Sequence, residues 1–332
     1  MKNISLVTFI FFITVLFNGC DKKEDKDTNI VAKEIKKISV RLPIPVIEAG
    51  QTPFYVAYDK GYYKDEGLEV DFGMGSKELN PVKMVVAGKD TFGVLGGPDT
   101  LLTARSKGHN IKAVSILHKE SNFPCLITLK SSGITKLEQL QDSKIGYFYG
   151  HISTDVLRNM LRKNNIKHTE VDVGFDYSQL IAKKIDAEWA FTVTAGLQLP
   201  YKGIDINIIS PKDYNITTHG YTIFTTDEII NKNPKLVAKF VKATLKGVDY
   251  MIQNPKDSLK SLLKRNPKLQ KDLSLTRLKK YIEVTSNGKN YPLGYMDEGM
   301  FKETYTRLIE EKVIQKEFDV KEAFTTEFLV KQ

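Results

Sequence analysis

Cysteine is nearly absent from this sequence, which has only Cys20 and Cys125 among its 332 residues. Two thiols are too few for a disulfide scaffold or for a cysteine-based zinc or iron–sulfur site. The five histidines never fall at metal-ligand spacing on one predicted element. The sequence also lacks Gly-x-Gly-x-x-Gly after a strand, Gly-x-x-x-x-Gly-Lys-Ser/Thr, Gly-x-Ser-x-Gly and His-Glu-x-x-His. These absences argue against a dehydrogenase or a hydrolase, so we predict no catalytic residue, no metal and no cofactor.

A long block of one charge is also missing. Lysine and arginine number 49 against 40 acidic residues, a net charge of +9, and the charges are spread along the chain. No nucleic-acid partner is therefore expected. Hydrophobic residues make up 41%, aromatic residues 10% and charged residues 27%, which is a globular composition. Since the chain is about twice the usual domain length, two lobes are expected.

The chain begins with an export signal. Lys2 is followed by an apolar run over residues 4–17 and then by Asn18-Gly19-Cys20, a pattern too short for a stable membrane span. Residues 16–20 resemble a bacterial lipobox, which implies that Cys20 is acylated. The alternative is a buried cysteine in an uncleaved anchor.

The segment after Cys20 is rich in charge and poor in residues able to form a core, which predicts a solvated tether. We therefore expect a lipoprotein signal peptide over residues 1–19 and a flexible tether over residues 20–36. The mature protein is expected to be extracytoplasmic and lipid-anchored to the cell membrane, at its periplasmic face if two membranes are present. Cys125 is expected to be buried.

Short strands and helices alternate from residue 38 onward. The first series predicts strands over residues 38–44, 68–72, 91–95 and 111–117, with helices over 53–64, 81–87 and 98–106. The second predicts strands over residues 125–129, 145–149, 170–173 and 187–193, with a helix over 152–161 and short helices around Leu137 and Leu180. This order predicts an α/β fold of two lobes, each with a mostly parallel sheet covered by helices.

The last third, from about Asp227, is almost entirely helical. Asn-Pro steps at residues 233–234, 254–255 and 266–267, like the one at 80–81, each place an N-cap residue before a proline at the first helical position. We expect a helix to start at each step.

Side chains at the carboxyl ends of predicted strands are the candidates for ligand contact, because open parallel sheets bind ligands there. Tyr149 and Phe191 lie at strand ends, where ligand contact and packing remain equal alternatives. Trp189 lies deeper in its strand and on the same side as Phe191, so core packing is favoured. Ser153 and Thr154 are helix caps or donors to a polar ligand group. Glu188 is interpreted as structural.

The segment over residues 54–70, with Phe54-Tyr55-Val56-Ala57 and Lys60-Gly61-Tyr62-Tyr63, resembles the opening motif of ABC-importer substrate-binding proteins of the sulfonate, nitrate and thiamine-pyrimidine-precursor group. The similarity continues through residues 88–94, 130–134 and 243–247. Residues 292–297 and 323–329 resemble the branch for thiamine pyrimidine precursors or riboflavin-like vitamins. The resemblance covers residues 38–330.

The resemblance implies a type II periplasmic-binding-protein fold, with lobe 1 over residues 37–122 and 222–332 and lobe 2 over 123–221. A two-segment hinge is expected at residues 119–124 and 218–221, and the helical tail is expected to pack on lobe 1. The implied partners are a small heteroaromatic ligand and a membrane permease, and the protein is expected to be a monomer and no enzyme. Riboflavin-like, sulfonate or amino-acid-like ligands, a thiamine-pyrimidine synthase that consumes pyridoxal phosphate, and an adhesin remain as alternatives.

The predicted ligand positions share one property, which is a place just past a strand's carboxyl end, at a helix amino terminus or beside the hinge. They are Gln51, Thr52, Phe54, Tyr55, Gly97, Pro98, Tyr149, Ser153, Thr154, Phe191, Thr192 and Tyr221.

Overall fold

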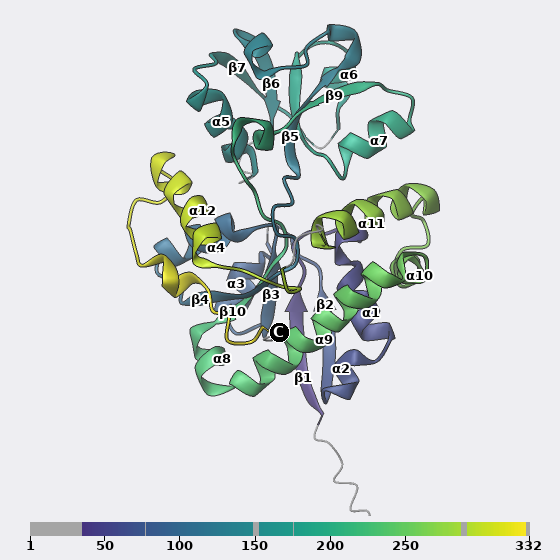
Figure 1. Ribbon diagram of the computed structural model, residues 1–332, viewed down its shortest axis with the longest axis vertical. Coiled ribbons are helices and arrows are strands. Elements are labelled where there is room, and N and C mark those ends of the chain that lie inside the picture. Colours follow the sequence, from purple (N-terminus) through teal and green to yellow (C-terminus); the bar gives the residue numbers. More distant parts are fainter. Residues whose placement is uncertain (1–34, 77, 149–152, 175, 287–290, 330–332) are drawn as a thin grey trace, which may run out of the picture. The chain divides into compact units, whose positions relative to one another are not determined.

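The computed structural model describes residues 35–76, 78–148, 153–174, 176–286 and 291–329, which form two five-stranded sheets (Figure 1). The first has the order β2-β1-β3-β10-β4, with β1 Lys36–Arg41, β2 Leu68–Gly73, β3 Phe92–Leu95, β4 Ile111–Ile116 and β10 Thr222–Thr226. The second has the order β7-β6-β8-β5-β9, with β5 Pro124–Leu129, β6 Ser143–Tyr147, β7 His168–Asp172, β8 Ala187–Phe191 and β9 Ile206–Ile209. The expected two α/β lobes are confirmed.

Each sheet contains one reversed strand. The strands β1, β2 and β3 are parallel, and β10 enters antiparallel between β3 and β4. In the second sheet, β6 is parallel to β7 and β8, whereas β5 is antiparallel to β8 and β9. Each reversed strand is the first one after the chain has crossed from the other sheet, so the reversals mark the two crossings.

The helices with the first sheet are α1 Thr52–Asp59, α2 Tyr62–Asp65, α3 Pro81–Val86, α4 Pro98–Ser106, α8 Asp227–Lys232, α9 Pro234–Gln253, α10 Pro255–Arg265, α11 Lys271–Ser286 and α12 Glu298–Glu310. Those with the second sheet are α5 Ser153–Lys163, α6 Ser178–Ile181 and α7 Ala195–Tyr201. Short 3-10 turns are η1 Ala49–Gln51, η2 Lys130–Ser132, η3 Leu137–Leu140, η4 Pro211–Tyr214 and η5 Val320–Ala323. None of the helices within these ranges is long and apolar enough to cross a membrane.

The two crossing segments lie side by side. The amide of Gly220 donates to the carbonyl of His118 at 2.8 Å, and the amide of Leu117 donates to the carbonyl of Tyr221 at 2.8 Å. The amide of Thr218 donates to Oδ1 of Asn122 at 2.9 Å. These bonds join the expected hinge segments into one two-stranded connection between the sheets.

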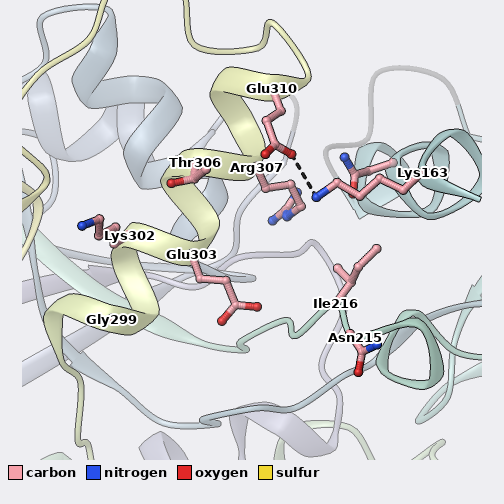
Figure 2. A pocket seen from close by; sticks show the side chains of 10 residues that line it. Lys163, Asn215, Ile216, Gly299, Lys302, Glu303, Thr306, Arg307 and Glu310 are labelled. Atoms are coloured by element: carbon pink, nitrogen blue, oxygen red, sulfur yellow. Dashed lines mark ion pairs between the residues drawn. The ribbon is translucent and has the colours of Figure 1, made fainter.

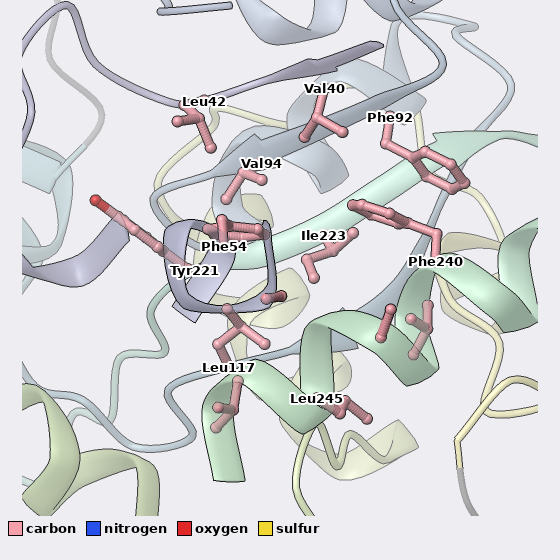
Figure 3. Close-up of a cluster of buried hydrophobic side chains, with 14 of the residues drawn as sticks. Val40, Leu42, Phe54, Phe92, Val94, Leu117, Tyr221, Ile223, Phe240 and Leu245 are labelled. Carbon is pink, nitrogen blue, oxygen red and sulfur yellow. The ribbon is translucent and has the colours of Figure 1, made fainter. Parts of the chain in front are cut away.

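The helical tail packs on the first lobe, as expected. Phe240 of α9 stacks on Phe92 of β3 with ring centroids 4.2 Å apart, and Figure 3 shows both rings in the core. The helices α1 and α9 contact each other closely at Gly247, where an added Cβ would collide with the carbonyl oxygen of Pro53. A small residue is therefore required at this crossing.

Several expected boundaries were wrong. The helix expected over residues 53–64 is two helices, because Gly61 adopts a left-handed φ of 80° between them. The strands expected to reach residues 149 and 193 end at Tyr147 and Phe191. The helix expected at Pro267 begins instead at Lys271, after a turn over residues 267–269.

The Asn-Pro steps do not all act as N-caps. The side chain of Asn80 accepts from the amide of Val82 at 2.9 Å, as predicted. Asn233 and Asn254 make no such bond. Asn254 instead donates from Nδ2 to the carbonyl of Tyr250 at 3.2 Å, so it closes the preceding helix while proline starts the next.

Candidate functional site

The predicted site residues of the first lobe lie where β1 and β3 give way to α1 and α4. Gly97 is the N-cap of α4, Pro98 is its first residue, and both are buried. A Cβ at position 97 would lie 2.7 Å from the carbonyl oxygen of His219 in the second crossing segment, so Gly97 permits this close approach. The edge of the first sheet is therefore packed directly against the hinge.

The start of α1 is held by side chains. The hydroxyl of Tyr55 donates to Oε1 of Gln51 at 2.9 Å, and Nε2 of Gln51 donates to the carbonyl of Val46 at 3.0 Å. Thr52 is fully buried, and its hydroxyl has no hydrogen-bond partner within the described ranges. Phe54 is fully buried in the core, edge-on to Phe72 at 6.2 Å, a placement that favours packing over ligand contact (Figure 3).

An acidic group that sequence reasoning missed lies beside these residues. The carboxylate of Glu48 accepts from the hydroxyl of Tyr221 at 2.5 Å. Burial raises the pKa of Glu48, while hydrogen bonds from the Gly50 amide, Tyr221 and Tyr281 act in the opposite direction. Tyr281 lies on α11, so Glu48 accepts hydrogen bonds from the η1 turn, the hinge and the helical tail.

Gly50 is required at the centre of this group. A Cβ at this position would lie 2.6 Å from Oε1 of Glu48 and 2.8 Å from the ring of Tyr281. No single sequence motif contains Glu48, Gly50, Tyr221 and Tyr281 together, because they come from distant parts of the chain.

The second lobe presents a row of aromatic rings at the ends of β6 and β8. Phe148 stacks on Trp189 with centroids 6.0 Å apart, and Trp189 meets Phe191 edge-on at 5.5 Å. Trp189 is 2% exposed and belongs to the core, as its deeper position in the strand predicted. Phe191 is only partly buried and packs against the cores of both lobes. Tyr149 lies outside the described residues.

The hydroxyl residues of the second lobe have different placements. Ser153 is the first residue of α5. Thr154 is fully buried, and its hydroxyl accepts from Nη1 of Arg158 at 2.8 Å, which ties it to a structural ion pair between Arg158 and Glu170. The amide of Thr192 donates to the carbonyl of Phe123 at 2.8 Å, so Thr192 follows β8 at the first crossing.

Glu188, interpreted as structural, is fully buried in β8, and neither carboxyl oxygen has a hydrogen-bond partner in the described part of the chain. Burial, with a smaller contribution from the charge of Asp176, raises the pKa of Glu188 to about 8. Cys125 lies on the adjacent strand β5, two residues before Ile127, the residue that pairs with Glu188. It is buried, as expected.

The buried histidines offer no metal site. Burial lowers the pKa of His118 to about 3, and Nδ1 of His118 lies 2.8 Å from the hydroxyl of Thr285. Burial lowers the pKa of His219 to about 4, and Nδ1 of His219 accepts from the amide of Glu120 at 3.0 Å. Among the residues with a described placement, no three His, Cys, Asp or Glu side chains gather as a metal site would require.

A matching family model covers residues 48–258 and carries the description NMT1/THI5 like. The chain belongs to this family. The matched region begins at Glu48 and includes every predicted ligand position, whereas Arg277 and Tyr281 of α11 lie beyond it.

Among NMT1/THI5-like relatives, the riboflavin-binding protein RibY of Chloroflexus aurantiacus is 28% identical over 294 residues, which cover 83% of this chain and 82% of that protein. The formylaminopyrimidine-binding protein of Halalkalibacterium halodurans is 24% identical over 84% of this chain and 86% of its own. A 4-amino-5-hydroxymethyl-2-methylpyrimidine phosphate synthase of Saccharomyces cerevisiae is 28% identical over 67% of this chain and 69% of its own.

The fold recurs in solved structures. A putative periplasmic sulfonate-binding protein of Methylobacillus flagellatus superposes with a TM-score of 0.70 at 14% identity, covering 89% of this chain and 93% of its own. The expected periplasmic-binding-protein fold is therefore confirmed.

A separate cavity of about 370 Å³ lies between α5 and α12 (Figure 2). The ammonium of Lys163 on α5 pairs with Glu310 on α12 at 2.9 Å across one end of it. Asn159 also lines the cavity and is 1% exposed. None of the predicted ligand positions whose side chains the structure describes lines this cavity, which is therefore treated separately from the candidate site.

Proposed function

We propose that this protein is the substrate-binding component of an ABC importer and that it captures a small heteroaromatic vitamin precursor between its two lobes. A pyrimidine precursor of thiamine is the favoured ligand. The observation that carries the proposal is Phe191, a partly buried ring at a strand's carboxyl end that packs against the cores of both lobes. A ring in this place can stack on a flat ligand held between the sheets.

The groups around Phe191 suit such a ligand. Phe148 and Trp189 extend the aromatic surface in the second lobe. In the first lobe, Gln51 and Glu48 bring amide and carboxyl groups to the start of α1. A heteroaromatic ring with polar substituents needs both kinds of contact, because apolar walls supply affinity and a few polar groups fix orientation. Two relatives are named for binding a flavin and a pyrimidine, which supports this ligand class.

The main test is a thermal-shift screen of the mature protein against formylaminopyrimidine, hydroxymethylpyrimidine, riboflavin, an alkanesulfonate and an amino acid. A ligand at 100 times its Kd adds about 2.7 kcal/mol to the free energy of unfolding. Stabilisation by a pyrimidine is expected to be the largest. Stabilisation by riboflavin, the sulfonate or the amino acid alone would transfer the proposal to that ligand, and stabilisation by none would contradict it.

Closure of the lobes is the second test. Each lobe contributes half of the proposed contacts, so binding is expected to favour a closed arrangement and to lower the radius of gyration in small-angle scattering. An unchanged radius at saturation would contradict a hinged clamp.

The proposal of a lipid anchor rests on the sequence alone, since Cys20 and the predicted signal lie outside the described residues. We propose that Cys20 is acylated and holds the protein at the outer face of the cell membrane. Cys20→Ser is expected to release the protein from membranes or to leave the precursor unprocessed, with unchanged ligand affinity. Unchanged partitioning into detergent would contradict acylation.

The second candidate function is a pyrimidine synthase, because relatives with that name are 28% identical to this chain. Incubation of the purified protein with pyridoxal phosphate and iron separates the two. Our proposal expects no pyrimidine product, and formation of product would replace it by the enzyme.

A further inference from the structure

Arg277 of α11 lies at the junction of the two lobes. Its Nη2 donates to Oε1 of Gln198 on α7 at 3.5 Å, and α11 and α7 contact each other (Figure 1). The helix α11 also packs on η1, the turn that leads into α1. Arg277 therefore lies on a helix that contacts both η1 of the first lobe and α7 of the second.

Arg277 differs from the other partly or fully buried arginines. Each of those forms an ion pair: Arg41 with Asp90, Arg105 with Asp227, Arg158 with Glu170, Arg265 with Asp59, and Arg307 with Asp99. The remaining arginine, Arg162, is exposed and donates to the carbonyl of Glu310 at 3.3 Å. Arg277 is also partly buried, yet it forms no ion pair within the described ranges.

The hydrogen-bond donors of Arg277 are not saturated. Its Nε is buried and has no hydrogen-bond partner in the described part of the chain, and the bond to Gln198 is long. Burying a guanidinium costs free energy because the group loses its hydrogen bonds to water. One hydrogen bond to a neutral amide oxygen offsets this cost less well than an ion pair does. Arg277 thus lacks the carboxylate partner that each of the other buried arginines has within the described ranges.

The nearby carboxyl group does not supply that anion. The charge of Arg277 lowers the pKa of Glu48, but the hydrogen bonds of Glu48 come from Tyr221, Tyr281 and the Gly50 amide. Burial raises the pKa of Glu48, and no hydrogen bond joins Glu48 to Arg277 in the described part of the chain. Tyr177 of the second lobe also faces this cation and is neutral, since burial raises the pKa of its phenol.

We propose that Arg277 binds an oxyanion substituent of the transported ligand, so that the preferred cargo is a heteroaromatic ring carrying a phosphate or carboxylate group. The inference rests on the proposed function and narrows its ligand class. The planar fork of a guanidinium matches both oxyanions. An anion bound to Arg277 would lie on α11 of the first lobe, close to α7 of the second lobe. Its binding would therefore also favour the closed arrangement.

The test uses matched ligands in calorimetric titrations of the mature protein. The pyrimidine series is hydroxymethylpyrimidine, its phosphate ester and the corresponding 5-carboxylic acid, and the flavin pair is riboflavin and riboflavin 5′-phosphate. We expect an anionic member to bind about 10- to 100-fold more tightly than its neutral parent. The phosphate and carboxylate arms identify which oxyanion the site prefers.

Arg277→Gln is expected to remove this preference, so that the anionic member and its neutral parent bind the variant with similar affinity, and Arg277→Lys is expected to retain part of it. The control is Lys279→Gln, which removes one positive charge from an exposed position of the same helix and should retain the preference. Melting temperatures of all variants show that they are folded.

Two negative outcomes are distinct. If the neutral rings bind and their anionic forms gain nothing, or if Lys279→Gln and Arg277→Gln reduce the preference equally, this inference is overturned and the proposed function stands. If no ring of either series binds the wild-type protein, the proposed function fails and the inference fails with it.

Discussion

The hydroxyl of Tyr221 donates to Oε1 of Glu48 at 2.5 Å, although the two residues are 173 positions apart in the chain. Tyr221 lies at the end of the second crossing segment, where its carbonyl accepts from the amide of Leu117. Glu48 immediately precedes η1 and the start of α1. One hydrogen bond therefore connects the hinge to the proposed binding edge of the first lobe.

Tyr221→Phe is expected to lower the free energy of unfolding by about 1.5 to 3 kcal/mol, because a buried carboxyl group loses a strong hydrogen bond. The aromatic ring remains, so packing against His118 and Tyr281 is retained. Urea unfolding at pH 7 measures the change. The control is Tyr201→Phe, at an exposed position where the hydroxyl forms no described hydrogen bond. Equal midpoints for the two variants would contradict the role of Tyr221.

Gly50→Ala tests how closely the η1 loop approaches the tail. The new methyl group would lie 2.6 Å from Oε1 of Glu48 and 2.8 Å from the Tyr281 ring, so the loop or α11 must move. We expect a loss of about 1 to 3 kcal/mol in stability, with weaker ligand binding, because the groups around Glu48 shift together. Gly96→Ala is the control, since a Cβ there meets no atom within 4 Å. If the Gly50→Ala variant has wild-type stability and affinity, α11 can move aside at no cost in free energy, and the prediction is wrong.

The sequence predicted the elements well where local signals were strong. Hydrophobic alternation placed β2, a short apolar run placed β3, and Asn80-Pro81 marked the start of α3 with the expected cap. The same dipeptide failed at Pro267, because proline permits a helix start but does not require one. The strand β10 was not predicted from the sequence, and the composition of a buried strand does not show its direction.

The candidate site was predictable only in part, because some of its contacts join segments that are distant in the sequence. Phe191 ends a strand and Gln51 directly precedes a helix, and local patterns identify both places. Glu48 has no local signal, because its importance comes from Tyr221 and Tyr281, which the fold brings from distant segments. Arg277 looks like one more charged residue of an amphipathic helix, and only the structure reveals that it lacks a carboxylate partner within the described ranges.

Phe191 and Trp189 share a side of β8 but are expected to differ in function. Trp189→Ala should lower stability by about 3 to 5 kcal/mol, because it removes a ring that is 2% exposed in the core. Phe191→Ala should instead weaken ligand binding by about 1.5 to 3 kcal/mol, or roughly 10- to 150-fold, through lost burial and stacking. Calorimetric titration with parallel melting curves separates the effects. If Trp189→Ala remains stable and alone loses the ligand, the two roles are reversed.

Glu188 predicts a pH dependence of stability. Its pKa is about 8 in the folded protein, against a usual value of 4.5 that also applies to the unfolded chain. Between these values the unfolded chain releases the proton while the folded protein keeps it. The free energy of unfolding therefore falls as the pH rises from about 4.5 to 8, and this contribution is fully favourable only at the acidic end.

Glu188→Gln removes that titration and keeps the size of the side chain. We expect the variant to match the wild type near pH 4.5 and to be more stable by roughly 1 to 3 kcal/mol at pH 8, a range that allows for solvent screening. Urea unfolding at several pH values measures the difference. Glu138→Gln is the control, because Glu138 is exposed in the same lobe and its variant should follow the wild-type profile. If Glu188→Gln also follows the wild-type profile, folding does not raise the pKa of Glu188, and the prediction is wrong.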